Sequence, residues 1–237
     1  MAQPMRERIL DAAIQVIKER GVTAATTKEI ARTAGVSEGS LYNHFDNKSA
    51  LFGSALAQVA SGIRGAMMEL LSAIGKNTVE DNLTRLAAAA VRFYGDLLPM
   101  TGSALGDREV LSWLQRGGPA QGHGPGESPG SFRPDAVPDD GAVTASGPTG
   151  SSLSQAGPVQ GHARLITYLE AEQAAGRVTP ETRPPYLAAA LLGACQQHAF
   201  LTLLTGAQAV SAGAQLPPDP DDYARGLVRT ILVGHLP

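Results

Sequence analysis

The chain has little cysteine and no excess of positive charge. Cys195 is the only cysteine among 237 residues, so neither an intramolecular disulfide nor a multi-thiolate zinc site can form, and we expect a reducing, cytoplasmic location. Nineteen Lys and Arg face 22 Asp and Glu, which excludes a protein that coats nucleic acid by bulk positive charge. A local basic face is still compatible with this balance, because the first 50 residues carry seven basic and six acidic side chains.

Several other signals are missing. The N-terminus carries charges where a signal peptide has its apolar stretch, so secretion is not expected. No phosphate-cradling glycine loop and no cluster of metal-ligating residues is evident, so we expect no cofactor and no metal. Residues 186–206 are long and uncharged enough to span a bilayer. The polar run Gln196, Gln197 and His198 would be costly in lipid, so we expect no membrane contact, with a span as the less favoured alternative.

Apolar residues follow helical spacing, and no segment alternates with period two. With 43% hydrophobic residues the chain can build a sizeable core, and we predict an all-α fold. The expected helices cover residues 6–20, 27–34, 38–45, 48–74, 79–98, 103–115, 159–175, 185–205 and 221–233. Gly21, Gly35 and Gly75 follow three of them as C-terminal stops.

One segment interrupts this pattern. Residues 117–158 contain ten glycines and seven prolines, a composition that buries too little surface to offset the entropy of ordering. We expect a flexible insertion between two helices. The predicted domains are residues 1–47, which hold three short helices, and residues 48–237, which hold the longer ones.

Residues 26–52 predict a helix-turn-helix. Gly35 lies in the turn, small Ala31 lets the two helices approach closely, and Leu41 locks the second helix against the first. In this motif the second helix enters a major groove of DNA. Its outward residues are short or polar, as suits contact with base edges: Ser37, Glu38, Gly39, Ser40, Asn43 and His44.

Two further residues are candidates for DNA phosphate contacts. Tyr42 follows inward-facing Leu41 and must point elsewhere, which leaves its hydroxyl available to a phosphate oxygen. Lys48 begins the next helix, where the helix dipole disfavours a cation, and a phosphate would compensate for this. The alternative for Lys48 is an exposed lysine tolerated by solvent.

The same stretch resembles the DNA-binding domain of the TetR family of transcriptional regulators. The resemblance covers about residues 6–55, and beyond them only the helix count and the length agree. The matching positions are Thr27, Ile30, Ala31, Ala34, Gly35, Val36, Ser37, Gly39, Leu41, Tyr42, His44, Phe45, Lys48 and Leu51.

This resemblance implies a role for each candidate residue. The implied phosphate contacts are Thr27, Tyr42, His44 and Lys48. The implied base-reading residues are Ser37, Glu38, Gly39, Ser40 and Asn43. Glu38 has two interpretations: its carboxylate accepts from a cytosine amino group, or it only complements the positive end of the helix.

A homodimer is expected for a physical reason. A recognition helix of about eight residues spans only about 12 Å, too little for tight specific binding by one subunit. Two subunits would bind a palindromic operator with half-sites about one helical turn apart. The helices at 185–205 and 221–233 are the candidates for the interface, and the resemblance implies that they form a four-helix interface. Burial within a single subunit is the alternative.

The resemblance also implies an interior cavity for a small effector, which we expect to be apolar or aromatic. Thioether and aromatic side chains make adaptable contacts, although ordinary core packing is the alternative for each. The candidate lining residues are Met67, Met68, Phe93, Tyr94, Trp113, Tyr168 and His198. We predict a regulator, most often a repressor in this family, that the effector releases from DNA.

Two other functions compete with this prediction. Cys195 lies three residues before His198, a spacing that suggests a nucleophile and its base in a helical enzyme. A cysteine on such an apolar helix is more often a small core residue, and no acidic partner is within helical reach. An interaction scaffold with an incidental helix-turn-helix is the second competitor, and it predicts no salt-dependent DNA binding.

Overall fold

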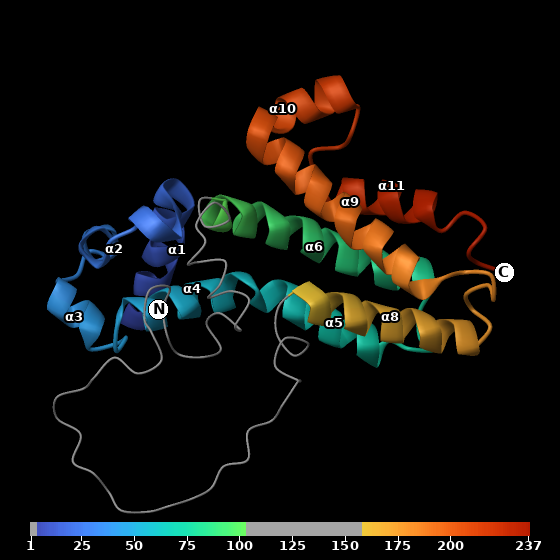
Figure 1. Cartoon of the computed structure of the whole chain (residues 1–237), viewed down its shortest axis with the longest axis horizontal. Coiled ribbons are helices and arrows are strands. Elements are labelled where there is room, and N and C mark those ends of the chain that lie inside the picture. Colours follow the sequence, from blue (N-terminus) through green and yellow to red (C-terminus); the bar gives the residue numbers. More distant parts are fainter. Residues whose placement is uncertain (1–3, 103–157) are drawn as a thin grey trace, which may run out of the picture.

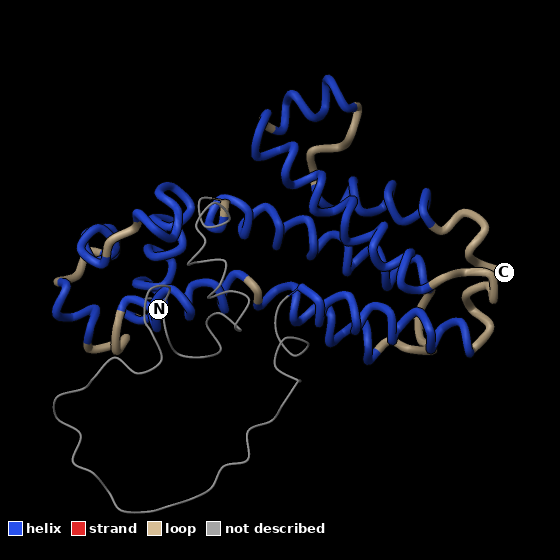
Figure 2. The backbone as a smooth tube through the Cα atoms, viewed as in Figure 1, coloured by secondary structure: helices blue, strands red, loops and turns tan. Residues whose placement is uncertain are grey.

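The computed structural model describes residues 4–102 and 158–237, and all regular structure in these two ranges is helical (Figure 2). The helices are α1 Met5–Ala24, α2 Thr27–Ala34, α3 Glu38–Tyr42, α4 Lys48–Val59, α5 Ser61–Ser72, α6 Val79–Thr101, α8 Pro158–Ala174, α9 Pro184–Thr205, α10 Ala207–Ala209 and α11 Pro220–Ile231, with a π-helical turn at Val210–Ala214. The predicted all-α fold is confirmed. The expected helix at 103–115 and the insertion up to residue 157 lie outside the described residues.

The ends of α2 follow from its sequence. The Thr26 hydroxyl oxygen accepts from the Glu29 backbone N–H at 3.2 Å and so caps the helix, and the hydroxyl donates to the Glu29 carboxylate at 3.0 Å. Gly35 ends the helix in the left-handed region, with φ at +68°. Arg8 Nη2 of α1 donates to Ala34 O at 2.7 Å, so α1 satisfies a carbonyl that the end of α2 leaves free. Gly21 also takes a positive φ, +77°, at the predicted stop in α1.

The single helix expected at 48–74 is in fact two helices. Asn47 caps α4 by accepting from the Ala50 N–H at 2.7 Å, and the helix breaks at Ala60, where ψ is −6°. Ser61 and Gly62, both weak helix formers, follow the break at once. Arg64 Nη2 donates to Ala57 O at 2.7 Å, beside the interruption.

Two apolar clusters form the core. The first joins α1 to α4 through residues such as Ile17, Ile30 and Leu41, and it also takes in Met100 from the end of α6. The second is built from α5, α6, α8, α9 and α11 around residues such as Leu83. Figure 1 shows α1, α2 and α3 gathered at one end of the molecule, while α6 extends from them to α9 and α11. The domain boundary after residue 47 stays a prediction.

A buried polar cluster ties α8 to the loop between α5 and α6. Glu172 is 0% exposed and forms an ion pair with Arg177, while its Oε1 accepts from the Gly75 N–H at 3.1 Å. Asn82 Nδ2 donates to the Tyr168 hydroxyl at 2.9 Å. Burial, the main cause, raises the pKa of Tyr168 to about 12, so its hydroxyl keeps its proton at neutral pH. Hydropathy alone did not reveal this cluster.

Candidate nucleic-acid interface and neighbouring groove

The recognition helix α3 is short and presents a polar outer face. Ser37 caps it by accepting from the Ser40 N–H at 3.1 Å, and Leu41 is fully buried against the first core cluster. The helix ends at Tyr42, before the predicted end at residue 45, although the His44 N–H still bonds to Leu41 O at 3.0 Å. The exposed residues along this segment are Ser37, Glu38, Gly39, Tyr42, Asn43 and His44, with Ser40 half-buried.

Three of the predicted DNA contacts touch one another. The Thr27 hydroxyl donates to Glu38 Oε1 at 2.6 Å, and the Tyr42 hydroxyl lies 3.5 Å from Thr27 Oγ1. A threonine hydroxyl has one proton to donate, so Thr27 can offer it to a phosphate only if Glu38 gives it up. The carboxylate of Glu38 therefore has a partner that neither sequence interpretation considered.

Lys48 also has a partner within the chain. It is exposed at the first position of α4, and its Nζ lies 5.1 Å from the centroid of the Phe52 ring. Such a cation–π contact contributes about 0.5–1 kcal/mol at an exposed site. The ring explains part of why a lysine is tolerated there, and the ammonium still faces solvent.

The predicted effector contacts do not share one cavity. Met67 and Tyr168 are buried in the second core cluster, and Tyr94 packs against it. Met68 is 59% exposed. Phe93 lines the groove described below, while Trp113 lies outside the described residues. The assignment of these side chains to an effector stays a prediction.

His198 and Cys195 are buried in α9. His198 Nε2 bonds to Pro217 O at 2.9 Å, and its ring centroid lies 4.0 Å from that of Tyr223. The Cys195 thiol donates to Ala87 O at 3.6 Å. Burial raises the pKa of this thiol to about 12, so it is protonated at neutral pH, the opposite of an activated nucleophile. No cluster of three or more metal-ligating side chains occurs in residues 4–102 or 158–237.

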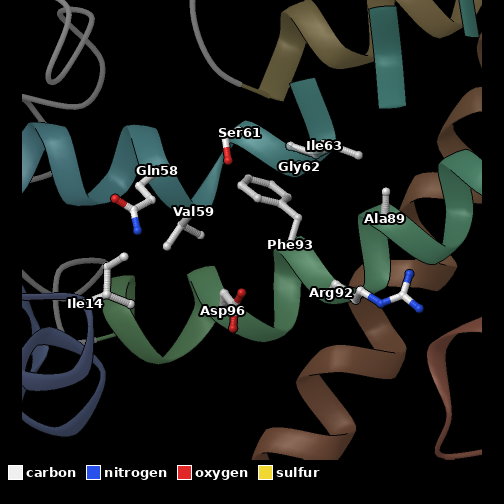
Figure 3. A pocket seen from close by; sticks show the side chains of 10 residues that line it. All are labelled: Ile14, Gln58, Val59, Ser61, Gly62, Ile63, Ala89, Arg92, Phe93 and Asp96. Atoms are coloured by element: carbon white, nitrogen blue, oxygen red, sulfur yellow. The ribbon is translucent and has the colours of Figure 1, made fainter. Parts of the chain in front are cut away.

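An open groove of about 500 Å³ lies where α1, α4, α5 and α6 meet (Figure 3). This volume falls within the range of small-molecule sites. Five of the lining residues are apolar or aromatic: Ile14, Val59, Ile63, Ala89 and Phe93. The others are Gln58, Ser61, Gly62, Arg92 and Asp96. Of the predicted effector contacts, Phe93 lines this groove.

Both charged residues of the groove have opposite charges as partners. Asp96 Oδ1 lies 2.6 Å from Lys18 Nζ of α1, and Arg92 forms an ion pair with Asp221 of α11. Gln58 Nε2 at the end of α4 donates to Asp11 Oδ1 of α1 at 2.9 Å. Two polar contacts therefore connect α1 to the opposite walls of the groove.

One side of α9 leaves apolar residues in solvent. Tyr186 is 72% exposed and Leu204 64% exposed, with Phe200 exposed between them, and these positions recur at helical spacing. The opposite side is buried against α6 and α11. Within the part of the chain that the structure describes, α9 alone is long and apolar enough to cross a bilayer, and buried core helices meet the same criterion.

Comparison with known proteins identifies the N-terminal domain. Residues 9–55 match the family model described as bacterial regulatory proteins, tetR family. This range holds the whole helix-turn-helix and the start of α4. The N-terminal part of the chain is that of a TetR-family transcriptional regulator.

Relatives in this family share the N-terminal part. The chain is 45% identical over 67 residues to an uncharacterised helix-turn-helix transcriptional regulator, YvkB, of Bacillus subtilis (strain 168), a match that covers 28% of the chain and 35% of YvkB. It is 33% identical over 78 residues to the regulator BetI of Escherichia coli (strain K12 / DH10B), which covers 33% of the chain and 40% of BetI. These matches thus span well under half of each relative.

Solved TetR-family structures extend the similarity in fold to the whole chain. A TetR-family regulator from Rhodococcus sp. has a TM-score of 0.60 at 16% identity, and the match covers 96% of the present chain and 98% of the Rhodococcus chain. The ketosteroid regulator KstR2 of Mycobacterium tuberculosis has a TM-score of 0.59 at 14% identity, and the match covers 100% of the chain and 97% of KstR2. Both confirm the predicted helical C-terminal domain. The family that residues 9–55 match consists of transcriptional regulators and is non-enzymatic, in agreement with the prediction.

Proposed function

We propose that the chain is a ligand-responsive repressor that binds a palindromic operator as a homodimer and is released by a small effector. The observation that carries the proposal is the exposed polar face of α3, held by buried Leu41 within a TetR-family helix-turn-helix. A bacterial regulator of this kind acts in the cytoplasm, where the operator lies. Fold alone does not assign a function, so the proposal depends on this surface.

The polar face suits a division between base and phosphate contacts. Asn43 is exposed just after α3, and an amide of this kind can bind adenine through paired hydrogen bonds. Lys48 and Tyr42, the latter 45% exposed, flank the short helix and are available to phosphates. His44 can donate to a phosphate in either protonation state.

The exposed side of α9 supports dimerisation. Tyr186, Phe200 and Leu204 lie on one side of α9 and form an exposed apolar patch. Patches of this kind mark interaction sites, whereas single exposed apolar residues do not. Ala190 and Gly193 lie between them on the exposed side and allow a second helix to approach closely. A second copy that covers this surface would form a self-complementary interface of the kind expected in a symmetric dimer. It would also remove the apolar side of α9 from solvent without a membrane.

The last part of the proposed function is a small effector that releases the repressor from DNA. One neighbour in fold, the regulator FadR of Bacillus subtilis, was solved in complex with stearoyl-CoA, with a TM-score of 0.51 at 17% identity. We expect the present chain to bind a different, apolar or aromatic molecule. Because coupling is reciprocal, such a ligand would weaken DNA binding by the same factor by which DNA weakens ligand binding.

Selection from a random duplex pool tests the proposal. The full chain should enrich inverted repeats, and Asn43→Ala should change the preferred base at one position in each half-site while the helical content stays the same. A match in base preference between Asn43→Ala and the unchanged protein would argue against base reading by this residue. Enrichment of no sequence at all would overturn the proposed function.

A further inference from the structure

We propose that Glu38 couples the reading of one base to one phosphate contact. In the free protein Glu38 holds the Thr27 hydroxyl, and it releases this hydroxyl to a phosphate only at a site where a cytosine amino group binds the carboxylate. Thr27 then contributes to base preference although it touches only the DNA backbone. This inference rests on the proposed function and adds to it the identity of one base and the pair of residues that select it.

Thr27 is enclosed in the free protein. Its hydroxyl donates to Glu38 Oε1 at 2.6 Å, and the Tyr42 hydroxyl oxygen lies 3.5 Å from Thr27 Oγ1. A hydrogen bond to a carboxylate is stronger than one between neutral groups. Thr27 is only 9% exposed, whereas Glu38 and Tyr42 are both exposed. A phosphate therefore reaches the Thr27 hydroxyl only after the Glu38 side chain has moved away.

A phosphate that binds here also meets the charge of Glu38. The exposed Tyr42 hydroxyl lies close enough to Thr27 that a phosphate bound to one comes within reach of the other. Thr27 begins α2, whose free backbone N–H groups favour an anion. With Glu38 still bonded to Thr27, the carboxylate and the phosphate would lie a few ångströms apart and repel each other. DNA that leaves Glu38 in place therefore loses the Thr27 contact and gains a repulsion.

The carboxylate of Glu38 determines which base can draw it away. An ionised carboxylate only accepts hydrogen bonds. In the major groove guanine presents two acceptors, thymine an acceptor and a methyl group, and adenine an acceptor beside its amino group, while cytosine presents its amino group alone. No lysine or arginine in residues 4–102 or 158–237 forms an ion pair with Glu38. A cytosine amino group there competes with the Thr27 hydroxyl and not with a cation.

Thr27→Val and Thr27→Ser form a matched pair of variants. Valine has nearly the shape of threonine but no hydroxyl, and serine keeps the hydroxyl. Both should preserve the fold, because Thr27 is buried and the Thr26 cap of α2 is unchanged, which circular dichroism and thermal melting can check. Lys48→Ala is a second control, since it removes a predicted phosphate contact whose side chain lies against Phe52 and not against Glu38.

The experiment measures the affinity of the full chain for a selected inverted repeat and for repeats with one base pair replaced in both half-sites. The position to replace is the one at which Glu38→Gln alters base preference, and we expect cytosine there. Thr27→Val should weaken binding to the cytosine repeat at least fivefold and to the replaced repeats less than twofold. Thr27→Ser should stay within twofold of the unchanged protein on every repeat. Lys48→Ala should weaken binding to all repeats by a similar factor.

A double-variant cycle tests the coupling itself. A neutral amide holds the Thr27 hydroxyl more weakly than a carboxylate, so in the Glu38→Gln protein the effect of Thr27→Val should no longer depend on the base. An equal loss on all repeats for Thr27→Val alone, no loss on any, or a base other than cytosine at the Glu38 position would overturn the inference and leave the proposed function standing. If the unchanged protein binds no inverted repeat, the proposed function itself fails.

Discussion

At the scale of single residues, the DNA-facing surface depends on contacts that sequence spacing does not encode. The positions of Glu38 and Tyr42 on one short helix were predictable, because Leu41 has to face the core. The hydrogen bond from Thr27 to Glu38 was not, because it joins two helices whose relative placement the sequence leaves open. For the same reason the contact of Lys48 with Phe52 became visible only in the structure.

Glu38→Gln tests the role of the carboxylate. The amide keeps the length of the side chain but removes the charge, and it adds a donor to the exposed first turn of α3. We expect the preferred base to change at one position in each half-site, with discrimination altered by about 1–3 kcal/mol. Competition binding with single-base variants of the selected site measures this. A uniform gain of affinity on every sequence would instead mean that Glu38 acts only through charge.

Lys48→Ala tests the phosphate contact. Affinity should fall by a similar factor on all DNA sequences, and the slope of log affinity against log salt should become shallower by about one for each lysine removed. Lys76→Ala, in the exposed loop between α5 and α6, is the control and should change neither quantity. An unchanged affinity and slope for Lys48→Ala would show that its ammonium serves only the Phe52 contact.

Cys195 provides a test of burial. Since burial raises the pKa of its thiol to about 12, the reactive thiolate is scarce at neutral pH. Iodoacetamide should label the native protein far more slowly than a free thiol, and labelling should become rapid in denaturant. The same shift predicts that the free energy of unfolding falls as pH rises from the pKa of this thiol in the unfolded chain toward its pKa in the folded protein. Rapid labelling of the native protein at pH 7 would contradict this account.

At the scale of helices, ends that depend on local chemistry were predictable and a break within an apolar pattern was not. Thr26, Gly35 and Ser37 determine the ends of α2 and the start of α3 through caps and a left-handed turn. The helical spacing of apolar residues continues on both sides of Ala60, so periodicity alone predicts one helix where two exist. Val59, Ser61 and Gly62, which flank this break, line the groove.

The exposed side of α9 leads to a prediction at the same scale. Leu204→Glu introduces a charge at the C-terminal end of the apolar side of α9 that we expect a second copy to cover, and an unpaired buried charge is costly. Sedimentation should show a dimer for the unchanged protein at micromolar concentration and a monomer for the variant. Val159→Glu, at an exposed apolar position on α8, should leave the dimer intact. A monomeric unchanged protein would remove the proposed interface.

At the scale of the whole molecule, the account requires two recognition helices on one piece of DNA. Each subunit offers only the short segment from Ser37 to His44, and the bulky helical remainder determines how far apart two such segments lie. The most direct test is the stoichiometry and affinity on a selected inverted repeat compared with a single half-site, measured by native mass spectrometry and titration. We predict two protomers on the full repeat and at least hundredfold weaker binding to the half-site; one protomer binding both with equal affinity would contradict the account.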